Sequence, residues 1–261
     1  MMHRQPLHAA KICLLLGGML AGLGLTACAV TWRGFTLAEW WRESHSGFIL
    51  WKADTRQKVV ALTFDDGPDP RYTPRILAIL RQYGVKATFF DVSRQVQAYP
   101  DLAREEVAEG HVVGNHTCSH PYLDHESRRQ VSLEIGRCET CLETTLHLRT
   151  HLFRPPRGDW NPTIFREARR QGDRLILWSV AVEHHEVHTP RALAARALRI
   201  VRPGSILLMH DGACQHREAT VAALPLILDG LKARGYRCVT VPELLHVPGD
   251  EAVPAPTSSR R

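Results

Sequence analysis

Short apolar runs alternate with amphipathic segments from position 58 almost to the end of the chain. The runs are rich in Val, Ile, Leu and Phe and have the length of buried strands, whereas the longer segments repeat apolar residues at helical spacing. Repeated strand–helix units imply parallel strands and therefore an α/β fold. The strands are expected at 59–64, 86–92, 112–115, 152–154, 174–180, 205–209 and 237–241, and the helices at 74–83, 102–109, 127–146, 162–171, 190–201 and 220–234.

An open doubly wound sheet and a closed barrel both accommodate such units. Polar motifs favour the barrel, because they follow the C-terminal ends of several different strands. A barrel gathers those ends around one mouth, whereas an open sheet leaves some of them far apart. We therefore expect an irregular (β/α)7 barrel. The polar motifs lie at 65–66, 116–120, 154–158, 183–185 and 210–211.

The first 27 residues have the layout of a secretory signal, with Arg4 and Lys11 before an apolar stretch at 12–26. That stretch is short and Gly-rich for a membrane span. It ends in Leu25-Thr26-Ala27-Cys28, which resembles the lipobox of bacterial lipoproteins, whose Cys is lipidated. We expect an exported lipoprotein anchored on the extracytoplasmic side of a membrane. A plain signal peptide or an uncleaved anchor is the alternative.

Three further regions follow the signal. Residues 28–57 are expected to form a juxtamembrane spacer and helix with an apolar face, 58–246 the main domain, and the Pro-, Ser- and Ala-rich segment 247–261 a disordered tail. The apolar face of the spacer would either pack on the domain or lie at the membrane interface. It is formed by Phe35, Leu37, Trp40 and Trp41.

Charge and cysteine content limit the partners. The formal net charge of +6 is spread along the chain without a nucleic-acid-binding motif, so we expect no nucleic-acid partner and a monomer. Seven Cys are present, and five remain after the signal and Cys28, so at least one thiol is unpaired or pairs between molecules. Cys138 and Cys141 lie in a helical pattern, where a local disulfide or two free thiols are both possible.

Two adjacent carboxylates, Asp65 and Asp66, end the strand predicted at 59–64 and precede a Gly-Pro turn. They repel each other unless a cation or a hydrogen-bond donor intervenes. A surface turn and a functional site explain this stretch equally well when it is taken alone.

A His pair, His116 and His120, has the i, i+4 spacing that places two imidazoles on one face of a helical turn and chelates a divalent cation. Hydrogen-bonded His side chains in a turn are the alternative. With Asp66 the pair becomes an Asp-His-His set with open positions, the layout of a catalytic metal site. Imidazole ligands suit Zn, Co, Ni or Fe, and the intervening Cys118 is expected to point away.

Four motifs together resemble the polysaccharide deacetylases, the NodB-homology domains of carbohydrate esterase family 4, over 58–245. The resemblance implies an irregular (β/α)7 barrel that uses one divalent metal to remove N- or O-acetyl groups from polysaccharides such as peptidoglycan, chitin, poly-N-acetylglucosamine or xylan. The motifs are Thr63-Phe64-Asp65-Asp66-Gly67-Pro68, His116-Thr117-Cys118-Ser119-His120, Arg154-Pro155-Pro156-Arg157-Gly158 and Leu207-Leu208-Met209-His210-Asp211.

The resemblance assigns roles to the residues of the first three motifs. Asp66, His116 and His120 would hold the metal, with Zn expected and Co or Ni as alternatives. The bound metal would polarise the acetyl carbonyl and activate a water. Asp65 would be the general base, and Arg154 would pair with it and fix its orientation.

Further roles concern the oxyanion, the leaving group and the acetyl pocket. The backbone N–H of Arg157, where the family usually has an aromatic residue, would help bind the oxyanion. His210 would be the general acid, with Asp211 orienting it. Leu208 would line the acetyl pocket, and Trp160 would stack on a sugar ring. Core packing is an alternative for both Leu208 and Trp160.

One family motif is altered. Many members have Trp-Ser-x-Asp-x-x-Asp-Trp, whose second Asp tunes the base pair or the acid, but here Ala181 replaces the first Asp and His184-His185 replace Asp-Trp. Glu183, one residue earlier, is the candidate for the missing carboxylate.

The expected function is metal-dependent de-N-acetylation of a cell-envelope or extracellular polysaccharide, with N-acetylglucosamine polymers such as peptidoglycan as the substrate class. A non-catalytic carbohydrate-binding relative and a small-molecule amidohydrolase of the same fold are the alternatives. A non-catalytic relative is expected to lose the base, the acid or a ligand, and this chain has all of them.

Overall fold

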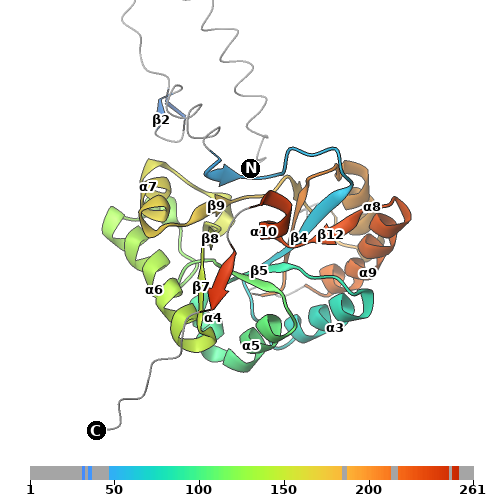
Figure 1. The fold of residues 1–261 in the computed structure, drawn as a ribbon, viewed down its shortest axis with the longest axis horizontal. Coiled ribbons are helices and arrows are strands. Elements are labelled where there is room, and N and C mark those ends of the chain that lie inside the picture. Colours follow the sequence, from blue (N-terminus) through green and yellow to red (C-terminus); the bar gives the residue numbers. More distant parts are fainter. Residues whose placement is uncertain are drawn as a thin grey trace, which may run out of the picture.

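The computed structural model describes residues 31–32, 35–36, 47–183, 187–212, 217–246 and 249–252. The predicted signal, Cys28 and most of the predicted spacer lie outside these residues, as do His184 and His185. Among the helices described, none is long and apolar enough to cross a membrane. The described part forms a curved sheet of parallel strands with helices on its outer side (Figure 1).

The sheet is built around β4 (Val59–Asp65), the longest strand described. β11 (Ile206–His210) pairs with one edge of β4, while β12 (Arg237–Val239) and β5 (Thr88–Asp91) share the other edge. β6 (Val112–Asn115), β8 (Leu152–Phe153) and β9 (Arg174–Ile176) continue the sheet from β5. All these pairings are parallel, as the strand–helix alternation predicts.

The sheet returns to β11 through a single segment, residues 174–181. We expected one strand at 174–180, but the structure has two, β9 and β10 (Val180–Ala181). β9 pairs with β8, whereas β10 pairs with β11, so this segment joins the two sides of the barrel. The strand breaks at 177–179 because the Arg154 guanidinium takes up two of its carbonyl groups, those of Ile176 and Leu177, at 3.1 and 3.2 Å. The predicted irregular barrel is confirmed, and this break is one source of its irregularity.

Helices flank the strands, and their ends follow ordinary capping chemistry. Ser127, the N-cap of the longest helix described, accepts a hydrogen bond from the Gln130 N–H, and Thr240 and Glu243 form a capping box. The short helix α4 was not predicted, because it lacks an apolar period. The helices are α3 (Thr73–Tyr83), α4 (Ser93–Ala98), α5 (Pro100–Ala108), α6 (Arg128–Leu146), α7 (Pro162–Gln171), α8 (Pro190–Ile200), α9 (Glu218–Ala233) and α10 (Val241–Leu245).

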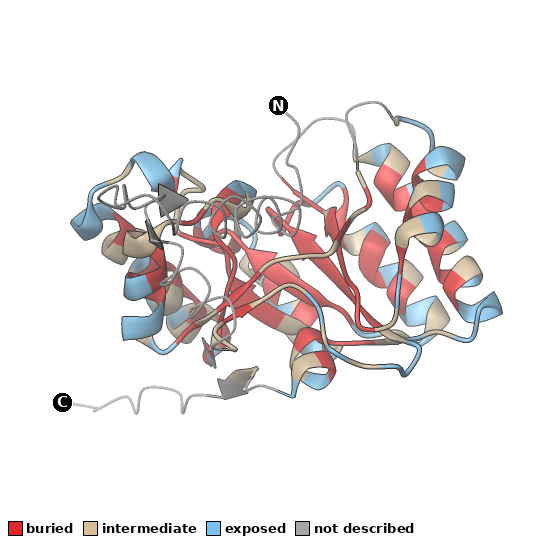
Figure 2. Cartoon of the chain, turned by 90° about the horizontal axis from the view of Figure 1, so that it is seen from above, coloured by how far each residue is buried: buried red, intermediate tan, exposed pale blue. Residues whose placement is uncertain are grey.

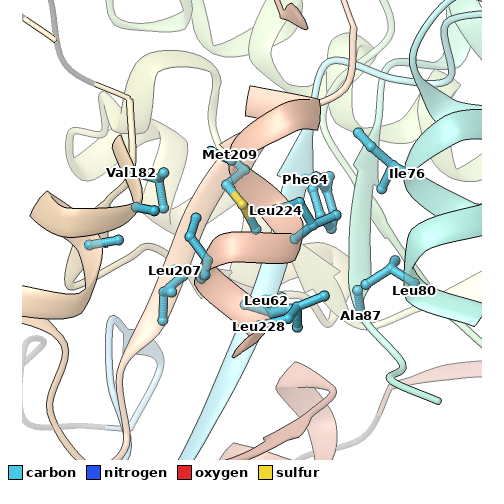
Figure 3. Close-up of a cluster of buried hydrophobic side chains, with 14 of the residues drawn as sticks. Leu62, Phe64, Ile76, Leu80, Ala87, Val182, Leu207, Met209, Leu224 and Leu228 are labelled. Carbon is cyan, nitrogen blue, oxygen red and sulfur yellow. The ribbon is translucent and has the colours of Figure 1, made fainter. Parts of the chain in front are cut away.

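The main hydrophobic core lies between the sheet and its helices, whose outer faces are exposed (Figure 2). Leu62 and Phe64 of β4 point outward and pack beside Leu207 and Met209 of β11 against α3 and α9 (Figure 3). Side chains alternate along a strand, so Thr63, between Leu62 and Phe64, faces the barrel interior. The strand thus places a hydrophobic face on the helices, and its inward face is polar only at the C-terminal end, at Thr63 and Asp65, whereas Ala61 belongs to an apolar cluster.

The domain extends beyond both predicted boundaries. β3 (Ile49–Leu50), in the predicted spacer, pairs with β9, and Lys52 forms an antiparallel bridge with Ser205. β13 (Asp250–Ala252), in the predicted disordered tail, pairs with β7 (Leu148–Thr150). Strands of two or three residues carry no readable period, so the sequence pattern missed them.

Candidate active site

The C-terminal end of β4 places Asp65 and Asp66 side by side, and both are buried. Asp65 is the last residue of the strand, whereas Asp66 has a φ of 77°, in the left-handed region that few non-glycine residues adopt. This backbone change separates the two carboxylates, and each contacts a different group of side chains.

Asp66 faces the predicted His pair. The Nε2 atoms of His120 and His116 lie 3.1 and 3.5 Å from Asp66 Oδ1. The pair does not form the helical turn that we expected: it lies in a loop after β6, with Thr117 and His120 at φ values of 73° and 57°. The predicted convergence with Asp66 is nevertheless present. Cys118, between the two His, is a half-buried free thiol outside this group.

The chemistry of these side chains fits a divalent cation. His116 Nδ1 lies 2.7 Å from the Arg154 carbonyl oxygen, which only accepts, so Nδ1 carries the proton and Nε2 presents a lone pair. The three ligand atoms lie within 4.8 Å of one another. Asp66 Oδ1 is buried and has no hydrogen-bond partner among the described residues. Lone pairs that converge on a buried carboxylate oxygen need a cation between them.

The charge state of Asp66 agrees with this reading. Burial disfavours the ionised Asp66 carboxylate, but attraction to the His116 and His120 imidazoles in their protonated form outweighs it and holds the pKa of Asp66 well below its usual range. A cation bound by neutral imidazoles would favour the same ionised form. Asp66 is therefore an anionic ligand at neutral pH.

Asp65 is held in place by Arg154. Arg154 Nη1 donates to Asp65 Oδ1 at 2.6 Å and to Thr63 Oγ1 at 2.8 Å, while the guanidinium stacks 4.0 Å from the Phe90 ring centroid. Burial lowers the pKa of Arg154, and the Asp65 carboxylate opposes that effect. With Oδ1 fixed in this way, Asp65 Oδ2 points toward His116, 3.8 Å from its Nε2.

His210 ends β11 and contacts the carboxylate that we inferred as a substitute in the altered motif. Glu183 Oε2 hydrogen-bonds with His210 Nδ1, and Oε1 accepts from Thr220 Oγ1 at 2.6 Å. Burial lowers the pKa of His210, but Glu183 outweighs it and raises that pKa above its usual value.

Arg217, which no sequence motif identified, contacts both Glu183 and Asp66. Arg217 Nη1 donates to Glu183 Oε2 at 2.8 Å, and Nη2 lies 3.7 Å from Asp66 Oδ2. No local pattern connects positions 66, 183 and 217, so only the fold brings them together.

Asp211 does not orient His210, contrary to our expectation. Its Oδ2 accepts from Thr73 Oγ1 at 2.5 Å, and Glu183 takes the predicted place beside His210. Adjacent residues of a strand point to opposite sides, and Asp211 directly follows His210. Burial and the neighbouring Asp91 raise the pKa of Asp211 well above its usual value.

Three other predicted residues lie around these groups. Trp160 is buried in a core cluster beside α7, so its expected role as an exposed sugar platform is wrong and the core-packing alternative holds. Leu208 is buried two residues before His210, on the same face of β11. Arg157 is exposed, with a φ of 61°, in the turn Pro156–Gly158 after β8.

Comparisons of sequence point to one family. The family model described as polysaccharide deacetylase matches residues 52–176. A peptidoglycan-N-acetylglucosamine deacetylase of Bacillus cereus is 39% identical over 77% of this chain and 94% of its own. A chitooligosaccharide deacetylase of Azorhizobium caulinodans is 35% identical over 71% of this chain and 94% of its own.

Comparisons with solved structures point to the same family. The Bc1960 peptidoglycan N-acetylglucosamine deacetylase superposes with a TM-score of 0.76 at 31% identity, over 82% of this chain and 98% of that one. A pseudoenzyme of carbohydrate esterase family 4 from Bacillus anthracis has a TM-score of 0.71 at 29% identity, over 78% of this chain and 70% of that one.

The barrel, the strand-end motifs and these relatives all lead to one conclusion: the chain belongs to the polysaccharide deacetylase family and is a deacetylase.

Proposed function

We propose that this enzyme removes N-acetyl groups from N-acetylglucosamine residues of a cell-envelope polysaccharide, with peptidoglycan as the main substrate, and that it uses one divalent metal. The observation that carries the proposal is the separation of Asp65 from Asp66. The Asp66 carboxylate lies against the His116–His120 pair, whereas the Asp65 carboxylate accepts a hydrogen bond from the buried Arg154. This arrangement supports a ligand and a base at adjacent positions.

Asp66, His116 and His120 would hold the cation, which is zinc by the preference of imidazole ligands, with cobalt or nickel as alternatives. When bound, it supplies Lewis-acid polarisation of the acetyl carbonyl and an activated water.

The remaining chemistry belongs to the chain. Asp65 accepts the proton of the attacking water at Oδ2, because Arg154 occupies Oδ1. The Arg157 backbone N–H helps to bind the oxyanion. His210 delivers a proton to the leaving amine from Nε2, because Glu183 holds Nδ1.

The alternatives are less well supported. The structural relatives include a pseudoenzyme, so the barrel alone does not establish catalysis. This chain, however, has the carboxylates of the proposed base and of Asp66 within 3.8 Å of His116 Nε2, and the proposed acid His210 is held by Glu183. Nothing in the geometry favours a small-molecule amidohydrolase. Chitooligosaccharides are the second candidate substrate, because one relative is named for them.

Export and membrane attachment through Cys28 complete the proposal. They rest on the signal-like segment and on Leu25-Thr26-Ala27-Cys28. Mass spectrometry of the mature N-terminus tests this part: a lipidated Cys28 supports it, and an intact residue 1 contradicts it.

Acetate release from peptidoglycan and from N-acetylglucosamine oligomers tests the activity. Zinc-loaded wild type is expected to release acetate and leave free amines on the glycan, whereas Asp65→Asn is expected to release none above background. A wild type that is inactive on every acetylated glycan, or an Asp65→Asn variant that equals it, would contradict the proposal.

A further inference from the structure

Arg157 and Tyr122 form a cationic lip beside the active site. The Arg157 Cζ lies 3.5 Å from the centroid of the Tyr122 ring, and Nη1 donates to the Pro121 carbonyl at 3.0 Å. The guanidinium is thus stacked and oriented, as cation–π contacts and planar hydrogen bonding favour. Both side chains are exposed, with 58% of Tyr122 accessible.

The lip joins two loops that also carry the chemistry. Tyr122 follows the proposed ligand His120 by two positions, and Arg157 follows Arg154, which holds the base, by three. Their loops leave neighbouring strands, β6 and β8, which pair through Asn115 and Phe153. A sugar whose acetyl group reaches Asp65 therefore passes within reach of the lip.

Most N–H donors of the Arg157 guanidinium have no acceptor among the described residues. An Arg side chain has five N–H groups, and within the described residues those of Arg157 bond only to Pro121. No carboxylate of the described part forms an ion pair with the Arg157 guanidinium, and Asp124, on the same loop as Tyr122, lies 3.6 Å from His125 Nε2. An exposed, oriented and uncompensated guanidinium suits the bidentate recognition of a carboxylate.

We propose that the Arg157–Tyr122 lip selects glycans that bear a carboxylate next to the acetylated sugar. This inference rests on the proposed deacetylase function and narrows its substrate class. Peptidoglycan strands carry a lactyl group on alternate sugars, and its carboxylate is free wherever the stem peptide has been removed, whereas N-acetylglucosamine oligomers carry no carboxylate. Stacking on Tyr122 and the hydrogen bond to the Pro121 carbonyl fix the plane of the guanidinium, and its remaining N–H groups are free to bind a carboxylate.

The test compares kcat/KM on three glycans of equal length: strands with free lactyl carboxylates, the same strands with those carboxylates amidated, and neutral N-acetylglucosamine oligomers. Wild type is expected to prefer the free carboxylates about tenfold, mainly through KM, as a hydrogen bond to a charged group allows. The preference is expected to shrink as salt is raised.

Arg157→Gln is expected to remove that preference, and Arg157→Lys to keep only part of it because Lys lacks the bidentate geometry. Arg104→Gln is the matched control, since Arg104 is an exposed Arg on α5 that pairs with Asp101, and it should preserve the preference. A wild type without preference, or an Arg157→Gln variant whose kcat/KM falls equally on all three substrates, overturns the inference. The proposed function is tested separately and stands as long as wild type releases acetate from any of the three glycans.

Discussion

Glu183 shares its two carboxylate oxygens among three side chains, His210, Arg217 and Thr220. It lies one position before the site of the Asp that the usual motif supplies, and the contact with His210 Nδ1 is nevertheless made. At the residue scale, therefore, a carboxylate one position earlier in the chain can still reach His210, because the Glu side chain is longer than that of Asp. The chain thus departs from the motif of its family and still places a carboxylate against His210.

Glu183→Gln is expected to lower the pKa of His210, because the carboxylate that raises it is lost. A general acid works while protonated, so the basic limb of the pH profile of kcat/KM should move to lower pH. Above the new limb, activity should fall about tenfold per pH unit.

Thr220→Val is the control for that experiment, because it removes a neutral hydrogen bond and keeps the carboxylate. Its basic limb should move less than that of Glu183→Gln. An unchanged basic limb in Glu183→Gln would mean that His210 is not the group that titrates there.

At the scale of elements, the sequence predicted which side chains come together better than it predicted the backbone conformation that brings them there. Asp66, His116 and His120 were identified from residue type and spacing, yet the His pair lies in a loop with left-handed residues, not in a helical turn. Spacing alone cannot distinguish the two, because both bring positions i and i+4 together. The break at 177–179 was also missed, since it depends on the distant Arg154.

Gly212→Ala is expected to weaken zinc binding about tenfold, the lower end of effects from residues that support ligands. A Cβ at this position would overlap the backbone carbonyl of Asp66, which follows β4, and would displace that ligand. Calorimetric titration with zinc provides the measurement.

Gly136→Ala, within α6, is the matched control, because its Cβ would meet only the end of the flexible Gln171 side chain. It should bind zinc as wild type does and gain some helix stability. If Gly212→Ala also bound zinc as wild type does, the close packing at Asp66 would not determine the geometry of the ligands.

For the molecule as a whole, strand and helix periodicity predicted parallel strands, and the polar motifs at the strand ends favoured an irregular barrel over an open sheet. The domain limits were less predictable, because β3 and β13 are too short for a pattern and form only by pairing with distant strands. The contacts of Arg217 were missed and the role of Asp211 was predicted wrongly for the same reason, because each depends on contacts between segments far apart in sequence.

Buried carboxylates are a feature of the whole fold and make its stability depend on pH. Burial and the nearby Glu139 raise the pKa of Asp173, between α7 and β9, to about 8. In the unfolded chain an Asp ionises near pH 4, so it loses its proton before the folded form does. Stability therefore falls as pH rises from about 4 to about 8.

Asp173→Asn is expected to remove that penalty. Its free energy of unfolding should match that of wild type at pH 4 and exceed it by roughly a few kcal/mol at pH 8, measured by urea denaturation. Asp101→Asn, at a residue with a 94% exposed side chain, should show no such change with pH. An Asp173→Asn variant that loses stability equally at both pH values would contradict the assignment.

The central claim is that Asp66 and the His pair hold a catalytic metal while Asp65 takes a proton. Zinc titration of metal-stripped enzyme, with acetate release from peptidoglycan followed at each addition, tests it directly. Wild type should regain activity up to a single equivalent, His120→Ala should bind zinc weakly and stay inactive, and Asp65→Asn should bind zinc normally but release no acetate. Full activity in the stripped wild type, or acetate release by zinc-loaded Asp65→Asn at the wild-type rate, would contradict the account.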